Sequence, residues 1–438
     1  MAGISRRSFL SSAPATPALA SAGIGIGSPR GISQTQRNPL DGVGREDIKI
    51  TDVKVTLLSS ELPLAKQWMD GAMIVWKTDE ILVQVFTDKG IVGIGSASQY
   101  GGPEAIKTLA EQTIRPLLAG KNPFDLDLLT CFWWPATFGP QVAWAAINNA
   151  LWDIVGKAKG VPVYSLLAAG TKPNPHIRMY ASGGHIVWYK RPEDVIDYAV
   201  SCKENGYFGF KLRIGTEWKH SNITVPKYIQ YLRKLRDAVG PDFHLMQEIN
   251  MRLPMDQVLE LCPALDELKF LWLEEPVDRW RAGAVDDHLK LKQAMPSVKM
   301  AGGETMMTRF EFKEWVDRGA YDIVQPDCNT TGLTEGWQIA RMAHLRGGLC
   351  CPHSWHGAVT LVANATLAAS IPNLLLLEMN QTYNPLRDEL FKEPLTVRKG
   401  YLDLPAKPGF GVELIGNFAQ KYAYIPGRYA KRNPDLPK

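Results

Sequence analysis

The sequence predicts an α/β fold, in which a (β/α)8-type, TIM-like barrel follows a separate α+β domain. The first observation is a series of short apolar runs within residues 208–380, which from Glu248 to Glu378 end in a polar residue every 23 to 30 residues. The second is that helical patterns such as Met255–Leu268 and Leu333–Arg346 fill the gaps between the runs. Continuous apolar runs separated by helices are typical of buried parallel strands with crossover connections. The third is an alternating pattern before this region, which predicts antiparallel strands.

The chain begins with a segment typical of export signals. Arginines at positions 6 and 7 precede a mildly apolar stretch that ends in small residues at Ala20. We therefore expect residues 1–20 to be a twin-arginine signal peptide, which would place the protein in the periplasm or otherwise outside the cytoplasm. The alternative is a disordered basic tail on a cytoplasmic protein. Residues 21–46 are rich in Gly, Ser and Arg and are expected to form a linker.

The composition argues against two classes of function. The chain has 49 Lys and Arg against 45 Asp and Glu, so its net charge of +4 gives no strong basic field for nucleic acid. It contains no apolar run of about eighteen residues, so no membrane span is expected. The six cysteines have no C-x-x-C spacing, and those in apolar runs suit free thiols better than a disulfide framework.

Residues 47–165 are predicted to form the α+β domain. The expected elements are strands at 48–57 and 80–97 and helices at Pro103–Leu118 and Pro140–Lys159. The strands are expected because alternating apolar residues bury one face of a sheet. Between them, we expect Leu62–Trp76 to be a loop. Its Trp68 could close over a ligand or pack locally.

Within the predicted barrel, residues 166–380, acidic side chains stand at the ends of successive strands. Glu248, Glu274 and Glu304 each follow an apolar run. Because the carboxyl ends of barrel strands point into one mouth, we expect the three carboxylates to converge. They would raise each other's pKa unless a cation neutralised them, and hard oxygen ligands suit Mg²⁺ or Mn²⁺. In the alternative, each is a solvated loop carboxylate, but their recurrence on three successive units favours the metal.

Several stretches resemble one family in the same order along the chain. Ala146–Lys157 and Gly160–Leu167 look like the helix and turn that join cap to barrel in the enolase superfamily, in its mandelate racemase and muconate lactonizing enzyme branch. The other matches are Lys211 with Arg213 (its K-x-K element), Glu248 with Asn250, Trp272–Pro276 and Gly303–Glu304 (its metal-binding strand ends), Gln325–Asp327 and Pro352–His353 (its Asp–His dyad), Glu378 (its final acid) and Pro408–Glu413 (its terminal segment). The resemblance implies that the α+β domain is a cap, to which the tail, residues 381–438, returns.

The resemblance implies removal of a proton next to a carboxylate, with a metal stabilising the charge that forms. The implied roles are Glu248, Glu274 and Glu304 as ligands of Mg²⁺ (or Mn²⁺), His353 as base or acid oriented by Asp327, Lys211 as a positive charge beside the enediolate, and Glu378 as a hydrogen-bond donor. Two other interpretations stay open. His353 could be a barrel-mouth histidine with satisfied hydrogen bonds, and Lys211 could be a structural ion-pair partner.

Two positions depart from the family pattern. Glu248 stands where the family usually has the shorter Asp. Arg213 replaces the second lysine of K-x-K, and a guanidinium is a poor proton acceptor at neutral pH. A racemase needs bases on both faces of its substrate, whereas a dehydratase needs one abstraction and one acid. His353 could do both in a syn elimination, so the expected activity is that of an acid-sugar dehydratase.

Polar and aromatic residues near the predicted mouth suit a polyhydroxy acid, an aldonate or aldarate. The residues expected to bind substrate are Asn250, Trp68, His185 and Arg309, and further candidates are Tyr180, Trp188, Asn329, Trp355 and His356. Alternatives are open for these residues too. Asn250 could cap a loop, Arg309 could belong to the following helix, and the loop histidines could face solvent.

The sequence thus favours an exported, Mg²⁺-dependent lyase that removes water from a sugar acid and gives a 2-keto-3-deoxy acid. One alternative is a racemase or epimerase of 2-hydroxy acids on the same scaffold. Another, suggested by the altered Glu248 and Arg213, is a non-catalytic sugar-acid-binding protein. The resemblance also implies a homo-oligomer.

Overall fold

The structure is a computed structural model, and it describes residues 38–125, 129, 137–184, 192–214 and 223–435. The expected export signal and most of the expected linker lie outside the described residues, as do His185 and Trp188. Among the described helices, none is long and apolar enough to cross a membrane. The five cysteines within the described ranges are buried and unpaired.

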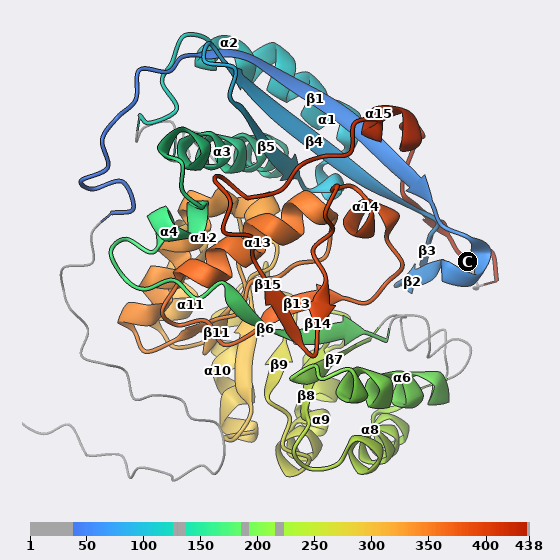
Figure 1. The fold of residues 1–438 in the computed structure, drawn as a ribbon. Helices are drawn as coiled ribbons and strands as arrows, with labels where there is room; N and C mark the ends of the chain where they lie inside the picture. Colours follow the sequence, from blue (N-terminus) through green and yellow to red (C-terminus); the bar gives the residue numbers. More distant parts are fainter. Residues whose placement is uncertain (1–37, 126–128, 130–136, 185–191, 215–222, 436–438) are drawn as a thin grey trace, which may run out of the picture. The chain divides into compact units, whose positions relative to one another are not determined.

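Eight parallel strands close into a barrel (Figure 1). They are β6 (His176–Gly183), β7 (Gly209–Arg213), β8 (His244–Glu248), β9 (Trp272–Glu274), β10 (Lys299–Gly302), β11 (Ile323–Val324), β12 (Leu349–Cys350) and β13 (Leu377–Asn380). Each strand from β6 to β12 is hydrogen-bonded to the next, and β13 pairs with β6. A bridge between Cys350 and Leu374 joins β12 to the segment before β13 and completes the ring. The predicted barrel is confirmed.

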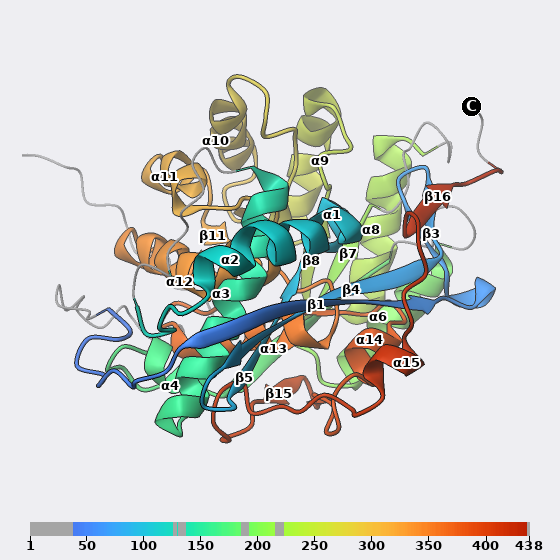
Figure 2. The same ribbon diagram turned by 90° about the horizontal axis from the view of Figure 1, so that it is seen from above.

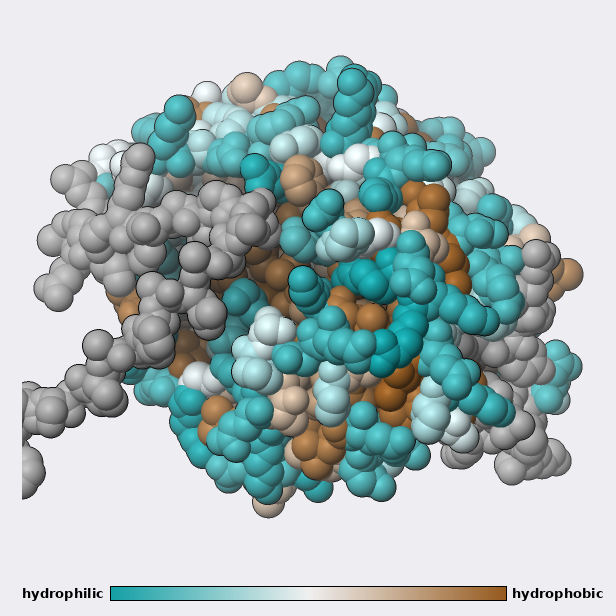
Figure 3. Space-filling view, turned by 90° about the horizontal axis from the view of Figure 1, so that it is seen from below, coloured by the Kyte–Doolittle hydropathy of each residue, from teal (hydrophilic) through white to brown (hydrophobic). Residues whose placement is uncertain are grey.

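The helices that follow β6 to β12 cover the outside of the barrel. They are α6 (Glu193–Glu204), α8 (Val225–Val239), α9 (Met255–Glu267), α10 (Ala284–Ala294), α11 (Arg309–Asp317), α12 (Cys328–Leu345) and α13 (Ala358–Ser370). Seen from below, the surface is largely hydrophilic with hydrophobic residues between polar ones (Figure 3), as expected for helices whose apolar faces turn to the strands. A buried cluster that includes Tyr180, Met246 and Trp272 fills the interior. The barrel is therefore a packed core, and its strand ends are the place for a ligand.

Helix α12 begins earlier than the sequence predicted. It starts at Cys328, not near Leu333, and Gly332 has a left-handed backbone (φ 74°) that kinks it. A Cβ at this glycine would lie 2.8 Å from Asn148 Oδ1 of helix α3 (Phe138–Lys159), so the two helices approach closely here. The first turn was missed because a glycine after polar residues is typical of a loop.

The cap is an antiparallel sheet with helices packed on it. In the order β1-β4-β5 it contains β1 (Ile50–Glu61), β4 (Lys77–Thr87) and β5 (Val92–Ala97); against it lie α1 (Pro103–Thr108), a π-helical turn (Leu109–Ile114), α2 (Arg115–Leu118) and α3 (Figure 2). At Gly95 of β5, a Cβ would lie 1.9 Å from the Ala146 carbonyl oxygen of α3. This glycine lets α3 pack directly on the sheet. Since α3 also contacts α12, it joins the cap to the barrel.

The tail returns to the cap, as the resemblance implied. Strand β16 (Ala430–Arg432) pairs with β3 (Met73–Val75), and Ala423 bridges Leu58 of β1. The buried Lys77 ammonium of β4 also donates to the carbonyl of Ile425. The remaining short elements are α4 (Val163–Leu167), α14 (Pro385–Asp388), α15 (Phe418–Lys421), β14 (Val397–Arg398), β15 (Tyr401–Asp403) and the 3-10 turns Leu64–Lys66 and Gln99–Gly101.

The segment Leu62–Trp76, expected as a loop, is instead a hairpin. Strand β2 (Trp68–Asp70) pairs with β3, and Gly71 at the turn has a φ of 58°. The tail supplies the third strand of this small sheet. The expectation was wrong because the strand that stabilises the hairpin lies more than three hundred residues further along the chain.

Candidate active site at the strand ends

The predicted charged residues converge at the carboxyl ends of the barrel strands. Lys211 is on β7, Glu248 ends β8, Glu274 ends β9 and Glu378 is on β13, and each is at most 2% exposed. Glu304 follows β10 by two residues. Before it, Gly303 has φ 103°, and a Cβ there would lie 2.3 Å from the Phe312 ring. Only glycine fits this turn, which directs Glu304 into the cluster.

Glu248, Glu274 and Glu304 can each offer one oxygen to a common metal. The three oxygens lie within 4.8 Å of one another. Glu248 Oε2 and Glu304 Oε2 are buried and accept no hydrogen bond from the described residues. Buried carboxylate oxygens without donors are costly, and hard oxygen ligands are those that Mg²⁺ and Mn²⁺ prefer. The three residues therefore fit a divalent cation, and Glu248 reaches the cluster despite its extra methylene.

Lys211 lies at the centre of the buried acids. Its Nζ is 2.5 Å from Glu274 Oε1, 3.0 Å from Glu378 Oε1 and 3.5 Å from Glu248 Oε2. Burial would lower the pKa of Lys211, but the charges of Glu274, Glu378 and Glu248 raise it well above its usual range. These carboxylates therefore hold Lys211 as a cation.

Burial and repulsion separate the protonation states of two neighbouring carboxyls. Burial would raise the pKa of Glu274, but the charge of Lys211 and hydrogen bonds that include one from Gln325 (2.7 Å) lower it to about 2. Burial and the charge of Glu274 raise the pKa of Glu248 well above its usual range. The Glu248 carboxyl therefore tends to keep a proton in the metal-free protein, and a divalent cation would replace that proton.

His353 and Asp327 form a buried hydrogen-bonded pair. His353 Nδ1 lies 2.6 Å from Asp327 Oδ2, while Asp327 Oδ1 accepts hydrogen bonds from the Asn329 N–H (3.0 Å) and Asn364 Nδ2 (2.9 Å). The other nitrogen, Nε2, lies 3.3 Å from Glu304 Oε2. Asp327 thus fixes the imidazole with Nε2 turned to the carboxylates.

The charges around His353 set its basicity. Burial would lower the pKa of its imidazole, but Glu304, Glu378 and Asp327 raise it to about 9. Glu378 Oε2, which also accepts a hydrogen bond from the Ser354 N–H (2.9 Å), lies 3.8 Å from His353 Nε2. Neutralising these carboxylates would remove much of the stabilisation of the imidazolium.

Arg213 is buried beside the cluster. It is 8% exposed and its guanidinium lies over the Trp355 ring, 5.1 Å from the ring centroid. Burial would lower its pKa, but the charges of Asp70, Glu304 and Glu248 raise it, so the group stays a cation. The face of the site on which Arg213 lies therefore carries a guanidinium that keeps its proton, where the family pattern has the amine of a lysine.

Asn250 contacts the carboxylates directly. Its N–H donates to Glu248 Oε1 (2.7 Å) and its Nδ2 to Glu304 Oε1 (3.4 Å). Asn250 Oδ1 accepts from Arg252 (3.2 Å), and Arg252 is ion-paired with Asp70 of the cap hairpin. These contacts hold two of the acids and join them to the cap. The sequence suggested that Asn250 binds substrate or caps a loop, and neither interpretation includes this role.

The other expected substrate-binding residues lie in different places. Trp68 of β2 is 5% exposed and meets Trp355 edge-on at 5.8 Å between ring centroids, so the hairpin packs on the loop that carries His353. Arg309 begins α11, and its guanidinium pairs with Glu335 of α12 at 2.9 Å. That contact matches the alternative in which Arg309 belongs to the helix. His185 lies outside the described residues.

The sequence patterns assigned no role to Gln325, Asn364 or the Asp70–Arg252 pair. Gln325 is two residues before Asp327 in the recognised motif, so alternation along a strand could have placed it on the same face. Asn364 is within α13, and Asp70 belongs to the cap. Contacts between segments this far apart leave no local pattern.

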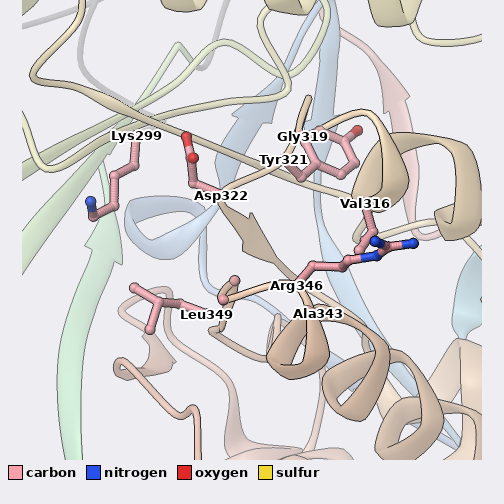
Figure 4. Close-up of a pocket in the computed structure, with 10 residues that line it drawn as sticks. Lys299, Val316, Gly319, Tyr321, Asp322, Ala343, Arg346 and Leu349 are labelled. Carbon is pink, nitrogen blue, oxygen red and sulfur yellow. The ribbon is translucent and has the colours of Figure 1, made fainter. Parts of the chain in front are cut away.

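Two cavities lie near strand ends. One, of about 500 Å³, is bordered by Trp68, Gly183, Tyr198, Gln381 and Arg387, next to the site. The other, of about 170 Å³, is lined by residues that include Lys299, Asp322 and Leu349 (Figure 4). Lys299 and Leu349 are the first residues of β10 and β12, so this second cavity is at the amino ends of the strands, away from the acids.

Two family models match the chain. The mandelate racemase / muconate lactonizing enzyme N-terminal domain matches residues 59–168, and the enolase C-terminal domain-like model matches residues 194–417. The chain belongs to the enolase superfamily. It is a member of the mandelate racemase / muconate lactonizing enzyme branch, as the strand-end motifs indicated.

Named relatives within the superfamily act on sugar acids or their lactones. The arabinonate dehydratase of Saccharolobus solfataricus is 31% identical over 352 residues, 78% of this chain and 90% of that one. The L-rhamnonate dehydratase of Saccharopolyspora erythraea is 31% identical over 360 residues (76% and 83%). The D-galactarolactone cycloisomerase of Agrobacterium fabrum is 28% identical over 387 residues (84% and 97%).

Solved structures of the superfamily superpose over most of the chain. A putative mandelate racemase from Bordetella bronchiseptica RB50, complexed with 2-oxoglutarate/phosphate, has a TM-score of 0.77 and 28% identity, covering 87% of this chain and all of that one (100%). The barrel with its cap is therefore the fold of the family.

Proposed function

We propose that the protein is a divalent-metal-dependent sugar-acid dehydratase, a hydro-lyase that gives a 2-keto-3-deoxy acid from an aldonate or aldarate. The observation that carries the proposal is the convergence of Glu248, Glu274 and Glu304 with the His353–Asp327 pair in one buried mouth. The relatives named arabinonate and L-rhamnonate dehydratase support the substrate class and the reaction.

Glu248, Glu274 and Glu304 would hold Mg²⁺, with Mn²⁺ as the alternative. Glu248 Oε2 and Glu304 Oε2, which are buried and accept no hydrogen bond from the described residues, support this assignment. The bound ion would supply electrostatic stabilisation for the negative charge that develops on the substrate carboxylate. Lys211, held 3.0 Å from Glu378, would add a second positive charge beside the same carboxylate.

His353 would take the proton from the carbon next to the carboxylate and return a proton to the departing hydroxyl. Its Nδ1 is occupied by Asp327, so Nε2 is the nitrogen that exchanges protons. With the carboxylates neutralised, the pKa of the imidazole would fall from about 9 toward the range in which a histidine accepts a proton at neutral pH. Glu378 would hydrogen-bond to the substrate carboxylate.

Arg213 favours a dehydratase over a racemase. A racemase needs a base on each face of the substrate, and the neighbouring carboxylates hold the Arg213 guanidinium in its charged form. One histidine is enough for a syn elimination, because it can serve first as base and then as acid. The racemase or epimerase is the second candidate, and a non-catalytic sugar-acid-binding protein is a third, from another class of function.

A screen of the purified mature chain with Mg²⁺ against a library of aldonates and aldarates tests the proposal. We expect 2-keto acid to form from at least one sugar acid. The product should be lost in His353→Asn and kept in His344→Asn, a control near the end of α12 and away from the acids. Proton exchange without product would support the racemase. Ligand-induced thermal stabilisation without exchange or product would support the binding protein.

Export and assembly are also proposals. The arginine pair at positions 6 and 7 supports export by the twin-arginine route, and Lys for both should leave the protein in the cytoplasm. Family membership supports a homo-oligomer, which light scattering on the purified chain would test.

A further inference from the structure

Glu80 is a buried acid of the cap that faces the loop carrying His353. It lies on β4, is 2% exposed, and its Oε2 occupies the space that a side chain at Gly357 would need. A Cβ on Gly357 would be 2.0 Å from that oxygen. Gly357 has φ −84°, so its backbone does not require glycine. The space taken by Glu80 requires it.

The carboxyl of Glu80 lacks the partners that usually accompany a buried acid. Neither oxygen accepts a hydrogen bond from the described residues. The Ser96 hydroxyl and the Gly357 N–H lie close to it, without full hydrogen-bond geometry, and only partly oppose the effect of burial, which raises its pKa to about 7. The nearest charged residues along β4, Lys77 and Asp79, pair with each other at 3.0 Å.

No charged side chain is among the groups that shift the pKa of Glu80. Strand β5 and helix α13 contain no titratable residue. A buried carboxyl in such a place costs stability. The contact with Gly357 therefore calls for a role other than stabilising the fold.

The segment from His353 to Gly357 is held in place residue by residue. Asp327 fixes the His353 ring, and the remaining peptide groups are bound from the end of the barrel. The contacts are Ser354 N–H with Glu378 (2.9 Å), the Trp355 carbonyl with Asn380 (2.7 Å) and the His356 carbonyl with Asn384 (3.3 Å). Gly357 is the next residue and the N-cap of α13. It is contacted by Glu80, which belongs to the α+β domain.

We propose that Glu80 is a positioning residue. By filling the space beside Gly357 it fixes the start of α13 and, four residues earlier, the orientation of His353, so that proton transfer depends on the cap being docked on the barrel. Glu80 touches neither the metal-binding acids nor His353, and it acts through the loop. This inference rests on the proposed function, because it assigns His353 the proton transfer.

The test uses Gly357→Ala, Glu80→Ala and the double variant in the full chain. The new methyl group collides with Glu80 in the first variant, and removing Glu80 empties the same space in the second. Because small misplacements of a catalytic group cost up to about a hundredfold in rate, we expect each single variant to lose about tenfold or more in kcat with little change in KM. In the double variant the methyl group fills the emptied space, so kcat should exceed that of either single variant.

Two further variants serve as controls. Gly139→Ala should behave like the wild type, since nothing lies within 4 Å of a Cβ there. Glu80→Gln keeps the shape of the side chain and should retain most of kcat. The proposal would be overturned by a wild-type kcat in Gly357→Ala, or by a double variant whose kcat does not exceed that of the more active single variant.

A second readout does not depend on turnover. In histidine-labelled protein, the ring signal of His353, identified by its loss in His353→Asn, should shift in Gly357→Ala and return toward the wild-type position in the double variant. A signal unchanged in every variant would overturn the positioning role. If the wild type dehydrates no sugar acid, the proposed function fails, and the ring signal still decides the role of Glu80.

Discussion

Replacing Glu80 by Gln should change the pH dependence of stability in a direction set by burial. Burial raises the pKa of this carboxyl from 4.5 to about 7 in the folded protein. The folded state therefore binds a proton more tightly than the unfolded state. Relative to a neutral glutamine, the contribution of Glu80 to the free energy of unfolding is fully present below its unfolded pKa. It is lost as pH rises through about 7.

The size of the effect follows from the shift. At about 1.4 kcal/mol per pKa unit, the rise from 4.5 to about 7 amounts to about 3–4 kcal/mol. Chemical denaturation of both proteins should give similar free energies of unfolding near the unfolded pKa of 4.5. Above about pH 8, the Glu80→Gln variant should be more stable by about that amount. Comparing two proteins that differ at one position cancels the other titrations. A difference that does not grow with pH would refute the argument that this carboxyl is buried without a partner.

Further predictions concern the site itself. In Asp327→Asn, the pKa of His353 in the metal-free protein should fall below its value of about 9, as a histidine titration by NMR would show, and kcat should fall by a hundredfold or more, on the order expected when a general acid–base loses its partner. Lys211→Met leaves three buried carboxylates without their shared cation, so denaturation in EDTA should show a loss of about 3–5 kcal/mol; an unchanged stability would contradict the buried network. Arg213→Lys restores an ionisable amine, and deuterium exchange at the carbon next to the carboxylate should rise; no rise would mean that this position does not face the substrate. Removing divalent metal should lower the melting temperature and adding Mg²⁺ should restore it, but not in Glu304→Gln.

The sequence was sufficient for the barrel and for the residues at its strand ends. Each of the three glutamates follows a buried apolar run that forms a strand, and in a parallel barrel the carboxyl end of each strand points into the mouth. Spacing alone therefore indicated that Glu248, Glu274 and Glu304 meet, and the structure places their oxygens within 4.8 Å of one another. These residues could be predicted because the relevant pattern is local and repeats on successive units.

What could not be predicted depends on pairs of segments far apart in the chain. The hairpin at 62–76 needs β16 beside it, and α12 bends where Gly332 meets Asn148 of the cap. The contact of Glu80 with Gly357 joins a cap strand to a barrel loop. Each feature depends on how the cap and the tail pack on the barrel. The residue pattern within one segment does not indicate which distant segment it will contact.

The dehydratase function is tested most directly by following the reaction of the sugar acid found in the screen by NMR, in deuterium oxide with Mg²⁺. We expect a 2-keto-3-deoxy acid as product, unreacted substrate that keeps its configuration, and no reaction in His353→Asn. Recovery of both configurations with deuterium next to the carboxylate, or product formation that survives in His353→Asn, would contradict this expectation.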